Sequence, residues 1–300
     1  MPDTASPEQQ DKPLARLVED QSLAVLAAID DLRHDLPGSV HDARVALRKL
    51  RSTLVVFRPL LDGDAAKALE DELRWFAGEL GGARDAQVVR SRVTSAIHGH
   101  PGGDDGGEEL LAALDAADEP TWDRARDALA DPRLDKLVAE LGQVRLGSLA
   151  GESDPEKLVA RTGDRLGQLV EKGRTAVRQG DDHRLHQLRK RVKRVRYAVT
   201  SLRDSAVEAL PAGSGGGRVV HALEELQDLL GEYQDAVVTA GVLDRIGSQA
   251  PRLAGLAGDL AASQRELAAS VRATLPAGVE RVRRAARRLA RRSPAVHLDR

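Results

Sequence analysis

Two segments of the chain carry a histidine and basic residues at matching positions, which restricts the fold to one built on a repeated unit. A shift of 145 residues places residues 41–51 on residues 186–196 without a gap, and it places Arg58 on Arg203. Neither segment contains glycine or proline, so each predicts a helix. Two copies of one helical unit predict two similar bundles related by a pseudo-twofold axis.

A second match follows each of these segments. A shift of 150 residues places Leu80 and Gly81 on Leu230 and Gly231. The five additional residues fit a longer loop at 211–217, which is rich in glycine. We therefore expect two repeats between a disordered N-terminus and a C-terminal tail. The expected boundaries are 1–11 for the N-terminus, 12–150 for repeat one, 155–292 for repeat two and 293–300 for the tail.

The apolar residues of the chain favour helices over strands. They are mostly Ala, Leu and Val, and the whole chain has only two Phe, two Trp and two Tyr. Strands are enriched in aromatic and β-branched residues, whereas Ala, Leu, Arg and Glu favour helices. The chain has no Cys, so neither disulfides nor thiolate metal sites contribute. These features predict an all-α fold made of helical bundles.

Glycine and proline positions predict where helices begin and end. Ser39 is expected to cap the second helix, with Asp42 three residues later completing a capping box. The glycines at 81 and 82 are expected to separate the third helix from the fourth. The predicted helices are 14–36, 39–58, 64–80, 84–97, 108–117, 121–130, 134–149, 156–178, 182–203, 218–230, 234–246, 253–274 and 277–292.

Both repeated helices place their basic residues on one face. At about 100° per residue, the basic positions of each helix fall within a sector of roughly 100°, beside an apolar sector that must face a core. We call these two sets the basic stripes. The first contains His41, Arg44, Arg48, Arg51 and Arg58, flanked by Lys49; the second contains His186, Arg189, Lys193, Arg196 and Arg203, flanked by Lys190 and Arg194.

A stripe of like charges needs a negative partner. Cations one helical turn apart repel one another by a few tenths of a kcal/mol per pair, and the stripes have almost no acidic residue at the i±4 positions. A charged helix face is usually just solvated, but its recurrence in a second helix favours a binding surface. Arg offers a planar fork of donors to phosphate oxygens, Lys a mobile point charge, and protonated His a further donor. The stripes therefore predict a binding site for a chain of phosphates.

Further basic residues are candidates for the same site. Lys12 and Arg16 in the preceding helix match Lys157 and Arg161 at the shift of 145 residues. Near the C-terminus, Arg284 and Arg288 share a helix face and could extend the binding surface. A nonspecific polyanion-binding tail is an alternative interpretation of that C-terminal segment.

Several classes of function are disfavoured by the sequence. The net charge of −2, from 45 basic and 47 acidic residues, argues against a nonspecific nucleic-acid coat. No apolar run approaches the roughly 20 residues that span a bilayer, and no signal peptide is recognisable, so a cytoplasmic protein is expected. There is no P-loop, no G-x-S-x-G motif and no carboxylate pair in a phosphate-binding setting, so we expect a binding module with no cofactor and not an enzyme.

The histidines are also candidates for a metal site. His183 and His186 are three residues apart, and His41 and His186 occupy matching positions in the repeats. Carboxylates and Cys are missing from that helix face, and a stripe of arginines would oppose a cation. We therefore expect no metal at these positions.

The two stripes and the segments that follow them resemble the conserved histidine α-helical domain family, CHAD. Its signature is similar to H-x-x-R-x-x-x-[RK]-[RK]-[LV]-R followed by L-G-x-x-[RQ]-D, and both occur twice, over about residues 12–292. Gln234 stands where the first copy has Arg84, and Lys193 where it has Arg48. The resemblance implies two helical bundles around a basic central channel, binding of inorganic polyphosphate and association with polyphosphate granules.

Some members of this family are fused to a triphosphate tunnel hydrolase domain. The E-x-E-x-K strand motif of that domain is absent, so a stand-alone member is expected. The leading hypothesis is a cytoplasmic protein that binds inorganic polyphosphate through both stripes and docks on polyphosphate granules and their proteins. Two alternatives stay open, namely a nucleic-acid-binding protein that uses the same groove and a metal-dependent phosphohydrolase that acts on polyphosphate.

Overall fold

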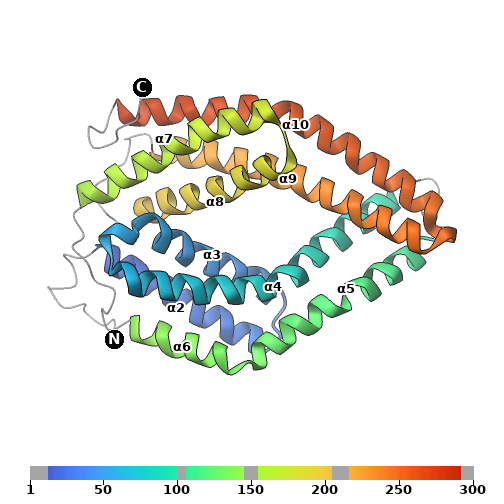
Figure 1. Cartoon of the computed structure of the whole chain (residues 1–300), viewed down its shortest axis with the longest axis horizontal. Helices are drawn as coiled ribbons and strands as arrows, with labels where there is room; N and C mark the ends of the chain where they lie inside the picture. Colours follow the sequence, from blue (N-terminus) through green and yellow to red (C-terminus); the bar gives the residue numbers. More distant parts are fainter. Residues whose placement is uncertain (1–12, 101–105, 145–154, 205–215, 292–300) are drawn as a thin grey trace. The chain divides into compact units, whose positions relative to one another are not determined.

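The described parts of the chain fold into α-helices. The computed structural model describes residues 13–100, 106–144, 155–204 and 216–291, and within these ranges it contains α-helices and two short 3-10 turns (Figure 1). The elements are α2 (Pro13–Arg33), α3 (Ser39–Phe57), η1 (Arg58–Leu60), α4 (Gly63–His98), α5 (Gly107–Ala130), α6 (Pro132–Val144), α7 (Pro155–Gln179), α8 (Asp182–Asp204), α9 (Gly216–Gln249), η2 (Pro251–Leu253) and α10 (Ala254–Ala290). The all-α fold class predicted from the composition is confirmed.

These helices form two compact units. The first unit comprises the described residues within 1–77, 129–227 and 276–300, and the second comprises those within 78–128 and 228–275. Each unit takes helices from both halves of the sequence, so the compact units do not coincide with the two sequence repeats. The repeat boundaries at 12–150 and 155–292, and the pseudo-twofold axis between them, stay predictions.

The first unit is organised around the contact between α3 and α8. These two helices pack against each other, α2 packs on α3, and α7 contacts both α3 and α8 (Figure 1). The apolar sector predicted for α3 is buried, with Leu47, Leu50, Leu54 and Phe57 fully enclosed. Leu188, Val192, Val195 and Val199 of α8 are buried in the same way. The apolar sectors therefore hold in the core the two helices that carry the basic stripes.

The second unit has a core of small and aliphatic residues from α4, α5, α9 and α10. Its buried members include Val93, Leu110, Leu243 and Leu260. Arg92 crosses between helices of this unit, because its guanidinium donates to Glu232 at 3.0 and 3.1 Å and to Gln264 at 2.9 Å. This pairing keeps a half-buried charge hydrogen-bonded at the edge of the core.

Several predicted helix breaks are wrong. α4 continues through Gly81 and Gly82, α5 through Pro120, α9 through Gly231 and α10 through Pro276. A proline removes one backbone hydrogen bond, and burial of a long apolar face over many turns can offset that loss. The expected part of α6 at 145–149 lies outside the described residues.

The predicted Ser39 cap is also wrong. Ser39 is the first residue of α3 and is buried, and the preceding residue is Gly38 in the left-handed conformation, with φ at 81°. The Gly38 carbonyl accepts hydrogen bonds from the amides of His41 and Asp42, at 2.9 and 3.1 Å. The helix therefore starts from a glycine turn without a side-chain cap. None of the described helices has a stretch long and apolar enough to cross a bilayer.

Gly82 allows α4 and α5 to approach closely in the second unit. A Cβ atom at this position would lie 2.8 Å from Cβ of Thr121, whereas a Cβ at Gly78 would meet nothing within 4 Å. Gly82→Ala is expected to lower the free energy of unfolding by about 1 kcal/mol, because overpacking outweighs the better helix propensity of Ala. The control Gly78→Ala is expected to raise it by up to about 1 kcal/mol. Urea denaturation measures both, and equal stability of the two variants would contradict the close approach.

Candidate anion-binding site

The first basic stripe lies along α3 and continues one residue beyond it. His41 and Lys49 are exposed, whereas Arg44, Arg48 and Arg51 are half-buried. Arg58 lies in the turn η1 and not on α3, because the helix ends at Phe57. The predicted residues from His41 to Arg51 therefore lie on α3, and Arg58 lies in the 3-10 turn that follows it.

The second stripe lies on α8 and is placed in the same way. His186, Arg189, Lys193 and Arg196 are half-buried, and Lys190 and Arg194 are exposed. The backbone of Arg203 belongs to α8, but its side chain lies outside the described residues, as does Lys12. Among the other candidates, Arg16, Lys157, Arg284 and Arg288 are exposed, and Arg161 is half-buried. Because α3 packs on α8, the structure brings the two stripes into one unit.

Glu70 of α4 supplies a buried countercharge to the first stripe. The residue is 2% exposed, and its carboxylate accepts hydrogen bonds from Arg51 at 3.0 and 3.2 Å. Arg74 donates to the same carboxylate, with its Nε 3.3 Å from Oε1, and Arg58 lies 4.0 Å from Oε2. Three arginines thus share one carboxylate that has almost no access to water.

Sequence reasoning missed Glu70, although the sequence contains a signal for it. Leu69, Leu73, Phe76 and Leu80 mark the buried face of α4, and Glu70 interrupts the apolar pattern on that face. An acidic residue at a core position needs a basic partner, because an unpaired charge is costly to bury. The charge stripe on α3 would have been the nearest candidate partner in the sequence.

The second stripe has a related contact. Arg196 occupies the position that matches Arg51 at the shift of 145 residues, and its Nη1 donates to Glu224 of α9 at 3.2 Å. Its guanidinium also lies over the ring of Tyr197, 4.4 Å from the centroid. Each stripe therefore has at least one arginine that is paired with a carboxylate of another helix.

Arg194 lies among other arginines from three helices. Its pKa is lowered from the ordinary value, first by desolvation and then by repulsion from Arg191 and Arg51, with a further contribution from Arg74. The negative charge of Glu70 offsets only part of this effect. Arg194 stays protonated at neutral pH, because arginine does not lose its charge in proteins. Its environment therefore has an excess of positive charge.

Arg165 of α7 extends this excess to a fourth helix. Desolvation lowers its pKa, followed by repulsion from Arg161, Arg194 and Arg191, while Asp164 opposes the shift. The Nε atom of Arg161 donates to the backbone carbonyl of Val56 at 3.2 Å and so joins α7 to α3. We call this set the arginine cluster; it comprises Arg51, Arg74, Arg161, Arg165, Arg191 and Arg194 with the carboxylate of Glu70. Arg74, Arg165 and Arg191 were not predicted, because no basic residue stands at their matching positions in the other repeat.

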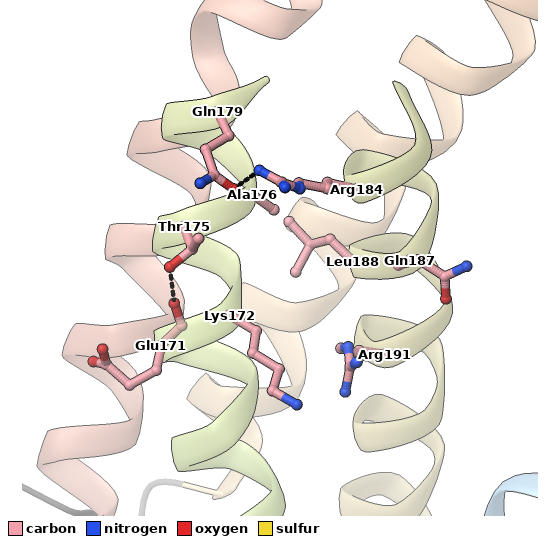
Figure 2. A pocket seen from close by; sticks show the side chains of 9 residues that line it. All are labelled: Glu171, Lys172, Thr175, Ala176, Gln179, Arg184, Gln187, Leu188 and Arg191. Atoms are coloured by element: carbon pink, nitrogen blue, oxygen red, sulfur yellow. Dashed lines mark hydrogen bonds between the residues drawn. The ribbon is translucent and has the colours of Figure 1, made fainter. Parts of the chain in front are cut away.

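The arginine cluster borders two pockets in the first unit. The larger lies between α7 and α8, with a volume of about 450 Å³ (Figure 2). Lys172 and Arg191 extend into the space between the two helices, and Glu171 also lines the pocket. Arg184, at the mouth, is paired with Asp181 at 3.1 Å. A second, smaller pocket is enclosed by α3, α7 and α8, and Arg191 lines both.

The candidate metal ligands do not gather into a cluster. Within the described ranges there is no group of three or more His, Cys, Asp or Glu residues that could hold a metal ion. His183 is exposed at the start of α8 and lies 3.4 Å from the amide nitrogen of Gln187. The histidines of the stripes thus lie beside arginines and lysines.

The chain matches the model of a known domain family and is similar to other proteins. The family model described as the CHAD domain matches residues 16–244. Two uncharacterized proteins of Mycobacterium tuberculosis, MT2285 of strain CDC 1551 and Rv2226 of strain H37Rv, are each 30% identical to it over 78% of this chain and 45% of theirs. The chain therefore spans less than half the length of these relatives.

Two solved structures have the same fold. PptA from Streptomyces chartreusis superposes with a TM-score of 0.68 at 19% identity, over 89% of this chain and 98% of PptA. The crystal structure of the CHAD domain from the plant Ricinus communis superposes with a TM-score of 0.63 at 25% identity, over 93% of this chain and 91% of that domain. The helical architecture is thus shared along most of the chain.

Replacement of the buried carboxylate tests the countercharge role. Glu70→Gln keeps the shape but removes the negative charge, so we expect the free energy of unfolding to fall by about 2–3 kcal/mol at low salt. The control is Asp71→Asn, which removes a half-buried carboxylate that also contacts Arg74, at 2.9 Å, and should have a much smaller effect. Urea denaturation of both variants measures the difference. Equal losses would show that Glu70 is not the countercharge of the arginines.

Proposed function

Because the chain belongs to the CHAD domain family, we propose that it binds inorganic polyphosphate through the basic stripes of α3 and α8. The family resemblance points to this ligand, and the charge pattern independently favours a phosphate polymer. The proposed contacts are the stripe residues and their flanking lysines and arginine, with Arg16, Lys157, Arg161, Arg284 and Arg288 as additional candidates.

The observation that carries this proposal is the crowding of arginines around one buried carboxylate. Arg51 and Arg74 share Glu70, and Arg194 is close enough to both for their repulsion to lower its pKa. A phosphate placed about 4 Å from one guanidinium gains roughly 4 kcal/mol at an effective dielectric constant of about 20. An anionic ligand would therefore relieve a repulsion that the protein only partly neutralises itself.

The length of the stripes favours a polymer over a single phosphate. From His41 to Arg51, α3 rises about 15 Å at 1.5 Å per residue, and basic side chains recur along this distance. A linear chain of phosphates can contact successive turns, whereas one phosphate contacts a single turn. Several of these arginines are half-buried and held by neighbours, which reduces the entropy lost when they bind.

We further propose that the protein is a binding module that docks on polyphosphate granules in the cytoplasm. Phosphoanhydride hydrolysis normally uses a divalent metal held by acidic residues, and the stripes consist of His, Arg and Lys. Release of orthophosphate from polyphosphate in the presence of Mg²⁺ or Mn²⁺, lost in His41→Ala or His186→Ala, would replace this proposal with an enzymatic one.

Reversal of charge on both stripes tests the binding site. The variant combines Arg44→Glu, Arg48→Glu, Arg189→Glu and Lys193→Glu. We expect the affinity for labelled long-chain polyphosphate to fall by roughly 100-fold or more, because favourable phosphate contacts become repulsive. Fluorescence anisotropy at several salt concentrations measures the affinity, and the slope of log K against log salt should become shallower.

A matched control keeps the same change in net charge. Arg124→Glu, Lys136→Glu, Arg245→Glu and Arg272→Glu alter exposed residues outside the stripes. This control variant should bind polyphosphate within a fewfold of the wild type, since surface charge far from the ligand acts mainly through screened interactions. Equal binding by the stripe variant and the control variant would exclude the stripes as the site.

Competition with nucleic acid tests the choice of polymer. The chain is slightly acidic overall and poor in the aromatic residues on which bases stack. We therefore expect single-stranded RNA and DNA to displace labelled polyphosphate only at a much higher concentration of phosphate charge. Displacement at equal charge concentration would favour a general polyanion-binding or nucleic-acid-binding protein.

A further inference from the structure

The pocket between α3, α7 and α8 is lined by three arginines. Arg165 comes from α7, and Arg191 and Arg194 come from α8. No carboxylate is among the described residues that line this pocket, whereas Glu171 lines the larger pocket between α7 and α8 and three acidic residues line a pocket beside α6. The three guanidiniums therefore share a small space with no lining residue to neutralise them.

Arg165 carries a buried donor without a partner. Its Nε atom is shielded from solvent and makes no hydrogen bond within the described part of the chain. Its Nη1 atom reaches Gln168 only at 3.4 Å, which is a long hydrogen bond. A buried donor without an acceptor costs about 1–3 kcal/mol. A ligand oxygen that accepts a hydrogen bond from this Nε atom would remove that cost.

The charged neighbours of the pocket leave it positive. Arg165 is repelled by Arg161, Arg194 and Arg191 and attracted by Asp164. Arg194 in turn is close to Arg51, Arg74 and Arg191 against Glu70. No side-chain hydrogen bond or ion pair of Arg191 or Arg194 with another described residue is present in the structure. Two of the three lining arginines are thus available to a ligand.

The remaining lining residues are Gln168 and four apolar side chains. Val55 and Val56 of α3 and Leu169 and Val195 of α7 and α8 line it. Apolar walls strengthen the attraction between a guanidinium and an anion, because they exclude water. The cavity volume is about 30 Å³, against about 450 Å³ for the larger pocket. A group that enters this pocket must therefore be much smaller than one that fills the larger pocket.

We propose that this arginine pocket binds one phosphoryl dianion, presented by the end of a condensed phosphate chain or by free orthophosphate. A phosphoryl group with only one bridging oxygen carries nearly two negative charges near pH 7, whereas an inner phosphate of a chain carries about one. Three guanidiniums favour the more highly charged group, and their planar forks match its free oxygens.

In its chain-end form, this inference rests on the proposed function. Arg194 both lines the pocket and flanks the α8 stripe, so a chain anchored by its end in the pocket can continue onto the stripe. The anchored end raises the effective concentration of the inner phosphates at the stripe. The protein would then distinguish chains by their ends as well as by their total charge.

Blocking of the chain ends tests this inference. The probes are polyphosphate of one defined length with free ends and the same polyphosphate with both ends converted to phosphoramidates. The wild type is expected to bind the free-ended chain about tenfold more tightly, because blocking lowers the terminal charge and removes an acceptor oxygen. The variant Arg165→Gln/Arg191→Gln should bind both probes with equal affinity.

The control variant is Arg178→Gln/Arg218→Gln, which removes two exposed arginines from α7 and α9 outside the pocket. It loses the same net charge and should keep the tenfold preference for free ends. Circular dichroism and thermal unfolding of each variant verify that the fold is retained. Loss of the preference in the control variant as well would overturn the assignment to the pocket.

Titration of orthophosphate alone separates the two sources of the phosphoryl group. In one outcome, orthophosphate binds saturably to the wild type but not to Arg165→Gln/Arg191→Gln, while end blocking has no effect. That result assigns the pocket to the free ion. An effect of end blocking that the pocket variant abolishes assigns it to chain ends. If neither probe distinguishes the wild type from the pocket variant, the inference is wrong.

The end-blocked chain also separates this inference from the proposed function. It retains its inner phosphates, so its binding depends on the stripes and should be lost in the four-residue stripe variant. If the wild type does not bind the blocked chain, polyphosphate binding through the stripes fails, while the orthophosphate titration still tests the pocket. If the blocked chain binds but end preference and orthophosphate binding are both missing, only the pocket fails.

Discussion

The carboxylate of Glu70 is buried on α4 and receives Arg51 from α3 and Arg74 from its own helix, with Arg58 4.0 Å away. A carboxylate in this position would be costly without cationic partners, and the arginines would repel one another without it. The positions of Arg51, Arg58 and Arg74 therefore depend on this charge. Three guanidiniums share one carboxylate, and the excess of positive charge around it is the basis of the proposed anion site.

Packing and charge act together in the first unit. Burial of the apolar sectors of α3 and α8 brings the two stripes into the same unit and places Arg194 near Arg51. The hydrophobic effect is non-directional and large enough to hold like charges near one another. The fold thus holds several cations near one another, so the proposed anionic ligand would not have to order them first.

Sequence reasoning predicted the fold class and the stripes because both depend on local periodicity. It failed where tertiary contacts outweigh local preference. Gly82 looked like a helix break, but it allows α4 to approach Thr121 of α5 within a helix that continues. Ser39 looked like a cap, but the left-handed turn at Gly38 starts the helix instead. The sequence pattern alone does not show whether a glycine ends a helix or allows two helices to pack closely. Nor does it show whether a serine caps a helix or is buried inside it.

The sequence by itself determined that the chain is helical, that it carries a repeated unit and that two helices bear basic stripes beside apolar sectors. These properties follow from residue types and their spacing along one helix. Only the tertiary structure decided which carboxylate neutralises the stripes and which further arginines join them. Glu70, Arg74, Arg165 and Arg191 are brought together by contacts between helices far apart in the chain. Charge interacts across space, whereas periodicity describes each helix alone, so the arginine cluster and its pocket became visible only in the packed fold.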